Sequence, residues 1–295
     1  MLEHINNKPL SSARVVILGA AGFVGHATRQ ALEAEGTPVL PIGRTEIDLL
    51  ANRAGNALAQ RLTPADTLVV ISAEAPCKDP AMLVRNTQMM GAVCDAIRAV
   101  QPKHVIYVSS DAVYKDIMEP ITETCCAEPG ALHGTMHITR EAMLRETVKG
   151  DLAILRPTLI YGADDPHNGY GPNRFQRLAE KGETIVLFGE GEERRDHVHV
   201  DDVAELIRLI ATHRSHGLLN AATGDLVSFR EVAEMIARLS DTPVRVKGSP
   251  RIGAMPHNGY REFDPAATFE AFPGFHYRTP AEGFALVNAQ RRAEI

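Results

Sequence analysis

Short apolar runs alternate with longer, mixed stretches along the first half of the chain. Five runs, rich in β-branched residues, have the length of buried strands: residues 14–18, 37–42, 68–71, 104–108 and 152–155. The stretches between them are amphipathic or otherwise compatible with helices: residues 23–35, 52–62, 81–100 and 131–149. Strands that alternate with helices at this spacing indicate βαβ units. We therefore predict an α/β fold built on a doubly wound parallel sheet.

The pattern changes after residue 160, where the elements become shorter and the loops longer. Residues 161–173 are rich in Gly, Pro, Asp and Asn, which predicts a loop. Beyond it we expect helices over residues 174–181, 201–213 and 228–239, and strands over residues 184–188 and 244–246. We divide the chain into a sheet domain, residues 1–160, and a smaller C-terminal α/β lobe, residues 161–295, interleaved with the first. The cleft between the two is the expected ligand site.

The first predicted strand ends in a glycine-rich turn with the spacing G-x-x-G-x-x-G, and a helix-compatible stretch follows directly. Such glycines permit a tight turn and a close approach of the backbone to a pyrophosphate, which the N–H groups of the helix N-terminus then bind. A generic glycine turn is the alternative, but the position between strand and helix is the one that dinucleotide binding requires. We therefore predict a Rossmann-like dinucleotide-binding domain. The expected cofactor contacts here are Gly19, Gly22, Phe23, Val24, Gly25 and, after the third strand, Ala73.

The first charged residue after the second strand bears on the choice of cofactor. An NAD site places an acid there to bind the ribose hydroxyls, whereas this chain has Arg44. A guanidinium suits the 2′-phosphate of NADP, because the contact is charge-assisted and often bidentate. The sequence therefore favours NADP over NAD, with a solvated surface arginine as the alternative. Asp48 is the alternative contact to the ribose or the adenine.

Composition and charge narrow the class of partner. Hydrophobic residues make up 44% and charged residues 23% of the 295 residues, as in ordinary globular proteins. The formal net charge of −6 gives no global attraction to nucleic acid or to an anionic membrane surface. There is no apolar signal segment and no run near the ~20 apolar residues of a membrane helix. Four cysteines do not make a disulfide scaffold, so we expect a cytoplasmic protein without nucleic-acid or membrane partners.

Further motifs follow the glycine turn in order. They are S-S-D-A-V-Y at residues 109–114, L-R-P-T-L-I-Y-G at 155–162, F-G-E-G at 188–191, R-D-H-V-H-V-D-D-V-A at 195–204, and N-A-A-T-G at 220–224 followed by S-F-R-E at 228–231. Together they resemble the extended short-chain dehydrogenase/reductase family of the NAD-dependent epimerase/dehydratase type, nearly from end to end. The resemblance implies an NAD(P)-dependent oxidoreductase or epimerase that acts on a sugar, a sugar nucleotide or a related hydroxy or carbonyl compound. It also implies a homodimer.

The catalytic pair of that family, Y-x-x-x-K, is absent. In the family the Tyr transfers the hydroxyl proton, and the Lys lowers the Tyr pKa and holds the ribose. By register His133 stands at the Tyr position and His137 at the Lys position. Three interpretations are open: His133 is the general acid/base and His137 orients it or contacts the ribose, the protein is a catalytically silent nucleotide-binding protein, or the two histidines are half of a metal site. No third metal ligand is visible, and we expect the first.

The resemblance assigns further site residues by register. Ser110 matches the Ser/Thr that hydrogen-bonds the reacting oxygen, unless it only caps the end of the strand. Asp111 matches an acid used by nucleotide-sugar 4,6-dehydratases, but Ala112 replaces the Glu that follows it there, so dehydration is disfavoured. Pro157 is an expected cofactor contact.

Three residues are expected to contact the substrate. Arg195 resembles the arginine that clamps the diphosphate of a nucleotide sugar, and an ion pair to Glu192 or Asp196 is the alternative. Asn173 and Arg174 lie where the family often contacts its substrate.

Overall fold

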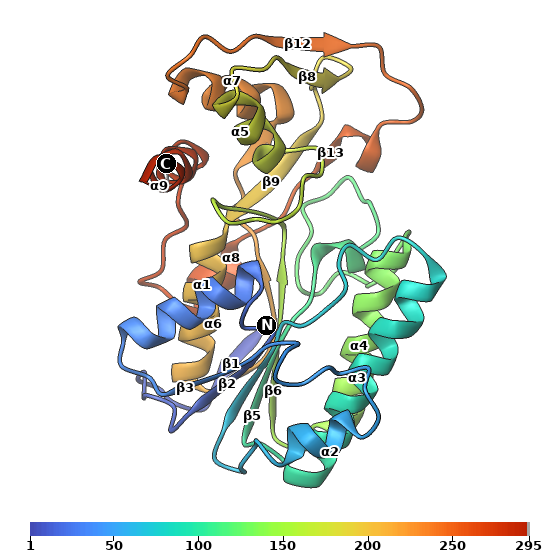
Figure 1. The fold of residues 1–295 in the computed structure, drawn as a ribbon, viewed down its shortest axis with the longest axis vertical. Coiled ribbons are helices and arrows are strands. Elements are labelled where there is room, and N and C mark those ends of the chain that lie inside the picture. The colour runs from blue at the N-terminus through green and yellow to red at the C-terminus, as the bar shows by residue number, and fades with distance from the viewer. Residues whose placement is uncertain (294–295) are drawn as a thin grey trace.

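The computed structural model describes residues 1–293 and places a smaller lobe above a seven-stranded sheet (Figure 1). The strand order is β1 (Leu2–His4), β10 (Ser215–Ala221), β6 (Asp151–Pro157), β5 (His104–Val108), β4 (Thr67–Val70), β2 (Val15–Leu18) and β3 (Val39–Ile42). All neighbours are parallel except β1, which is antiparallel to β10. Every residue of β2, β4 and β5 is buried, as expected for strands covered on both faces. The predicted α/β class and the parallel sheet are confirmed.

Helices cover both faces of this sheet (Figure 1). On one face lie α1 (Phe23–Ala34) and α6 (Val200–His213), and on the other lie α2 (Ala54–Ala59), α3 (Pro80–Val100) and α4 (Leu132–Thr147). Successive side chains of β2 alternate between the two hydrophobic cores, so that Val15 and Ile17 pack on the α6 side and Val16 and Leu18 on the α3 side. Because both faces of the sheet are packed against helices, its strands are fixed, and so are the chain segments that follow their carboxyl ends.

The lobe has a hydrophobic core of its own. Its elements are β7 (Leu159–Tyr161), α5 (Pro172–Glu180), β8 (Ile185–Phe188), β9 (Arg194–His199), β11 (Leu226–Ser228), α7 (Phe229–Leu239), β12 (Val246–Ser249), β13 (Tyr260–Arg261) and α9 (Pro280–Ala293). Strand β9 pairs with β7, β11 and β13, while β8 pairs with β12. Between these elements the chain returns to the large sheet through α6, β10 and α8 (Ala266–Ala271), so the two parts are interleaved.

Several predicted bounds differ from the structure. The amphipathic stretch 52–62 holds only the six-residue α2, because Arg53 has left-handed backbone (φ 62°) and cannot extend the helix. Helix α4 ends before Val148, and α5 begins at Pro172, inside the predicted loop. The strand expected at 244–246 lies instead at Val246–Ser249, where β8 pairs with it. No helix within residues 1–293 has the length and apolar character needed to cross a membrane.

Candidate active site

A cavity of about 900 Å³ runs along the carboxyl ends of the central strands, from the glycine turn to the loops of the lobe. Most of the residues predicted from the sequence line it: Gly19, Gly22, Phe23, Val24, Arg44, Asp48, Ala73, Ser110, Asp111, His133, His137, Pro157, Asn173 and Arg195. Gly25 and Arg174 do not. A second, more open cavity of about 1080 Å³ beside α6 contains none of the predicted site residues.

The three glycines of the turn have different roles. Gly19 has a φ of 90°, and a Cβ there would lie 2.8 Å from the backbone N of Ser72. A Cβ on Gly25 would lie 2.1 Å from the carbonyl O of Gly19, so this glycine lets α1 pack against the turn and does not face the ligand. Gly22 meets only the Gly19 carbonyl, at 3.3 Å, and its open side faces the cavity. The turn is therefore closed behind and open in front, which suits a pyrophosphate.

Arg44 and Asp48 stand together at the end of the cavity beyond the turn. Their closest atoms, Nη2 and Oδ2, are 3.7 Å apart, and the side chains are 78% and 42% exposed. The structure thus offers both a cation for a 2′-phosphate and a carboxylate for ribose hydroxyls in one place.

The two histidines lie one turn apart on α4, with ring centroids 4.8 Å apart and the rings edge to face. His137 is buried, and its Nδ1 is 2.8 Å from the hydroxyl of Tyr107. Burial, with the neighbouring His133 and Arg140, lowers the pKa of His137 well below 6.5. Burial also raises the pKa of Tyr107 to about 12, so the phenol keeps its proton. His137 is therefore neutral and does not supply the permanent charge of a lysine.

His133 is held at one nitrogen and lines the cavity. Its Nδ1 accepts a hydrogen bond from the backbone N–H of Cys77, with an N–N distance of 3.3 Å. Burial lowers the pKa of His133, Asp111 acts in the opposite direction, and His167 acts in the same direction as burial. His167, which also lines the cavity, and Cys77 were missed by sequence reasoning, because neither belongs to a recognisable motif.

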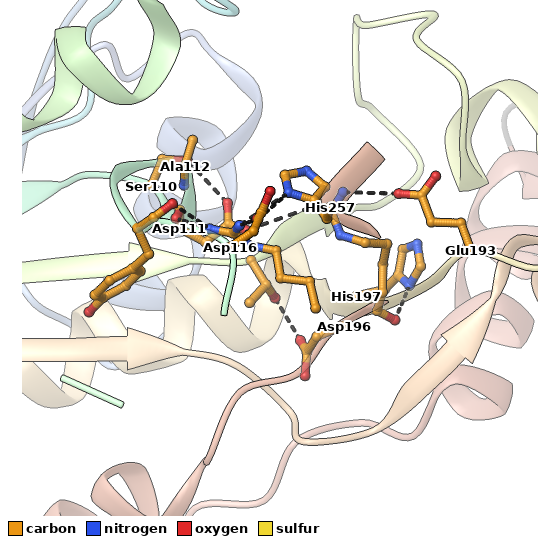
Figure 2. Close-up of polar contacts among 12 residues, drawn as sticks. Ser110, Asp111, Ala112, Asp116, Glu193, Asp196, His197 and His257 are labelled. Atoms are coloured by element: carbon orange, nitrogen blue, oxygen red, sulfur yellow. Dashed lines mark hydrogen bonds and ion pairs between the residues drawn. The ribbon is translucent and has the colours of Figure 1, made fainter. Parts of the chain in front are cut away.

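Ser110 and Asp111 lie at the start of a short 3₁₀ turn, η1 (Asp111–Val113), opposite the histidines. The Ser110 hydroxyl accepts from the N–H of Ala112 at 3.1 Å and donates to Asp111 Oδ1 at 3.3 Å, as Figure 2 shows. Ser110 therefore caps η1, and it also lines the cavity. The capping interpretation of this serine is confirmed, and its contact to a reacting oxygen stays a prediction.

Two arginines flank the Asp111 carboxylate. Arg195 Nη2 lies 3.6 Å from Asp111 Oδ2, and its Nη1 lies 3.4 Å from Glu193 Oε1. Arg261 is buried; its Nε lies 3.3 Å from Asp111 Oδ2, and its Nη2 donates to the carbonyl oxygens of Asp111 and Tyr114 at 2.8 and 3.1 Å. Arg261 was not predicted, because it reaches the site from β13, 150 residues along the chain.

The sequence suggested Glu192 or Asp196 as the ion-pair partner of Arg195, and both suggestions are wrong. Glu192 pairs instead with Arg251, at 3.2 Å. Asp196 points away from Arg195 and accepts hydrogen bonds from Thr158, Thr223 and Gly224, so it ties β9 to the loop after β10. Arg195 pairs instead with Asp111, which lines the cavity, and with Glu193, which does not.

Asn173 and Arg174 differ because α5 begins one residue before them. Asn173 faces the cavity; its Oδ1 accepts from the N–H of Gly162 at 3.2 Å, and its Nδ2 donates to Asp165. Arg174, about 100° further round the helix, is exposed and lies outside the cavity wall. Among residues 1–293 there is no group of three or more His, Cys, Asp or Glu side chains that could hold a metal ion.

The fold and the cavity define a dinucleotide-binding α/β protein. The chain belongs to the NAD-dependent epimerase/dehydratase family, whose sequence model matches residues 15–222. This confirms the family resemblance and the enzyme class that it implied.

Two curated relatives cover most of the chain. The dTDP-4-dehydro-6-deoxy-D-allose reductase of Streptomyces bikiniensis is 25% identical over an alignment of 283 positions, which covers 80% of this chain and 84% of that protein. The GDP-L-fucose synthase of Escherichia coli (strain K12) is 26% identical over 274 residues, with coverages of 78% and 82%. The fold is similar to that of a UDP-glucose 4-epimerase from Thermus thermophilus in complex with NAD, with a TM-score of 0.79, 20% identity and coverages of 96% and 100%.

Proposed function

We propose that the protein is an enzyme that binds NADP or NAD in the cavity and oxidises or reduces a hydroxyl- or carbonyl-bearing carbon of a sugar, a sugar nucleotide or a related compound, epimerisation included. One observation carries this proposal: a single cavity contains the glycine turn, His133 and Arg195. A dinucleotide and a second ligand can therefore meet beside His133. The relatives, a reductase of a dTDP-linked sugar and a GDP-L-fucose synthase, support a nucleotide-linked substrate.

The residues of the turn fit a dinucleotide, which when bound supplies or accepts a hydride. Gly22 leaves the space that the pyrophosphate needs, next to the N–H groups that open α1. Arg44 is mostly exposed and only loosely paired, so it is free to bind the 2′-phosphate of NADP. Asp48, beside Arg44 in the cavity wall, is the candidate contact for the ribose hydroxyls. We favour NADP, because a phosphate gains more from the guanidinium than a hydroxyl does.

At the other end of the cavity Arg195 is the candidate clamp for the diphosphate of a nucleotide sugar. His133 is the candidate group at the reacting oxygen, with Ser110 and Asp111 on the facing turn. The Asp111 carboxylate lies between two arginines, and Ala112 follows it in place of a second acid, so dehydration remains disfavoured. The absence of the family's Tyr and Lys favours a second candidate function, a catalytically silent nucleotide-binding protein.

The first experiment separates these two functions. NADPH and NADH are titrated into the purified full chain, and binding is followed by nicotinamide fluorescence. Turnover is then tested with dTDP-, GDP- and UDP-linked sugars, by the absorbance of the reduced nicotinamide and by NMR of the sugar, because epimerisation leaves no net change in the cofactor. We expect binding and conversion of at least one nucleotide sugar. Binding without conversion across the panel would establish the silent protein instead.

The cofactor preference is tested at Arg44. Arg44→Ala is expected to cost NADP about 1.5–3 kcal/mol of binding free energy, the range for hydrogen bonds to charged groups, or about 10- to 150-fold in Kd. Affinity for NAD should barely change. Arg29→Ala is the matched control, because Arg29 also forms an exposed i,i+4 ion pair, with Glu33, but lies outside the cavity wall. Equal losses for both cofactors in Arg44→Ala would show that Arg44 does not bind the 2′-phosphate.

A further inference from the structure

The hydrogen bond at His133 Nδ1 decides which tautomer this histidine adopts. A backbone N–H can only donate, so the N–H of Cys77 requires a lone pair on Nδ1. A neutral imidazole with an unprotonated Nδ1 carries its proton on Nε2. The donor is a main-chain group, so it does not titrate. His133 is therefore held as an Nε2–H donor.

The segment that carries this N–H is anchored on both sides. On one side Glu74 exchanges two hydrogen bonds with the buried Asn86 of α3: its N–H donates to Oδ1, and Nδ2 donates to its carbonyl, each at 3.0 Å. On the other side Asp79 caps α3 by accepting from the N–H of Met82 at 2.8 Å. Cys77 lies between these anchors and is itself buried. Its N–H is thus held in place independently of any ligand.

The rest of the surroundings leave Nε2 available. Among residues 1–293 Nε2 has no hydrogen-bond partner, and the side chain lines the cavity. The titratable groups that face His133 are His137 on its own helix, Asp111 on η1 and His167 on the loop after β7. Protonation of His133 would put a second N–H on Nδ1, pointing at the Cys77 N–H. The imidazolium is therefore opposed by geometry.

We propose that His133 acts as a neutral hydrogen-bond donor, with its Nε2–H directed at the reacting oxygen of the substrate, and that it does not itself exchange a proton during the reaction. A preorganised donor of this kind stabilises the negative charge that develops on the oxygen, and a neutral imidazole is able to serve. This inference rests on the proposed function, because the donor needs a reacting oxygen. When a carbonyl is reduced, its oxygen takes a proton from a water molecule and hydroxide remains; in the reverse direction hydroxide accepts the proton of the hydroxyl group and becomes water.

The tautomer can be measured without cofactor, substrate or turnover. The full chain is labelled with ¹⁵N-histidine, and its imidazole resonances are followed between pH 5.5 and 8.5, with His133→Gln to assign the signal. We expect the ¹⁵N chemical shift of Nδ1 to be typical of an unprotonated nitrogen and that of Nε2 to be typical of a protonated nitrogen. Both chemical shifts should stay unchanged over this pH range. A protonated Nδ1, or conversion to imidazolium near pH 6.5, would overturn the proposal whatever the enzyme's activity.

Kinetics supply the second readout. Gln keeps an N–H donor near the position of Nε2 but cannot titrate, so the turnover of His133→Gln should stay within about tenfold of that of wild type. His133→Ala has no donor, so its turnover should fall about 100- to 1,000-fold, the loss seen when one oxyanion-hole donor is removed. The pH profile of kcat should lack an ionisation near pH 6.5. The proposal is overturned if His133→Gln is as inactive as His133→Ala. It is also overturned if such an ionisation persists in His167→Gln, because that variant removes the imidazole on the loop after β7 and burial holds the pKa of His137 well below 6.5. A wild type without any turnover would reject the proposed function, and the NMR experiment would still decide the tautomer.

Discussion

Replacing Gly134 with alanine should separate the two elements that hold the candidate catalytic groups. Gly134 is buried on α4, directly after His133, and the helix packs there against η1. A Cβ at this position would lie 1.9 Å from the carbonyl O of Ala112 and 2.7 Å from Pro129 Cβ. Real Cβ atoms essentially never approach closer than 3.0 Å, so α4 and η1 have to move apart by about 1.1 Å.

This displacement sets the size of the effect. Overpacking of this kind typically costs about 1–3 kcal/mol of unfolding free energy. A misplacement of about 1 Å between reacting groups can cost about 100-fold in rate. For Gly134→Ala we therefore expect a loss of about 1–3 kcal/mol in urea unfolding and about 100-fold lower turnover. Dinucleotide affinity should fall much less, because the glycine turn lies on the other side of the cavity.

The matched control is Gly91→Ala in the middle of α3, where a Cβ would meet nothing within 4 Å. Alanine is a better helix former than glycine, so this variant should gain about 0.5–1 kcal/mol and keep its turnover. Both variants are compared by urea unfolding and by steady-state kinetics. If Gly134→Ala is as stable and as active as Gly91→Ala, the close packing of α4 on η1 does not position the site, and the reasoning fails.

Two further predictions concern binding and folding. Gly22→Leu should abolish dinucleotide binding but leave the unfolding free energy of the free protein nearly unchanged. Gly25→Ala should instead destabilise the fold, because its Cβ would clash with the turn. Tight dinucleotide binding by Gly22→Leu would reject the pyrophosphate site. Burial lowers the pKa of His104 from 6.5 to about 4, so the folded protein resists its protonation and stability falls as the pH drops from 6.5 toward 4. Wild type should lose about 2 kcal/mol more than His104→Gln between pH 7 and pH 5 in urea unfolding, and equal losses would contradict this assignment.

Elements of the fold that depend on local sequence were predictable. Strands β2, β4 and β5 are continuous apolar runs, and each is fully buried. Strand β10 was missed although it lies inside the same sheet, because its sequence, S-H-G-L-L-N-A, contains two polar residues, a histidine and a glycine. Its pairing with β6 and β1 is made by residues far away in sequence. Strand β1 and helix α9 gave no comparable signal.

The residues of the candidate site also fall into two groups, those with a local sequence signal and those without one. Gly22, Asp111 and His133 belong to segments with recognisable spacing, and all three line the cavity. Arg261 and Cys77 could not be predicted in this way. Arg261 acts alone from a distant strand, and Cys77 contributes only its main-chain N–H, which has no signature in any sequence. The interaction that fixes the tautomer of His133 is therefore visible only in three dimensions.

The electrostatics around the two histidines lead to the same role for His133. The lysine of the family's pair carries a permanent charge, whereas His137 at that position is neutral. Arg140, almost one turn further along α4, is fully buried, donates to the carbonyl O of Ser72 at 2.6 Å and lies with its guanidinium carbon 5.3 Å from the centre of the Tyr107 ring. Among residues 1–293 it has no carboxylate partner within ion-pair distance, although burying an unpaired charge costs several kcal/mol. This cation disfavours protonation of His137, whose ring meets that of His133 edge to face. A fixed positive charge behind two neutral imidazoles suits a site that receives a developing negative charge through an N–H donor, and it opposes a mechanism in which an imidazole has to gain a proton.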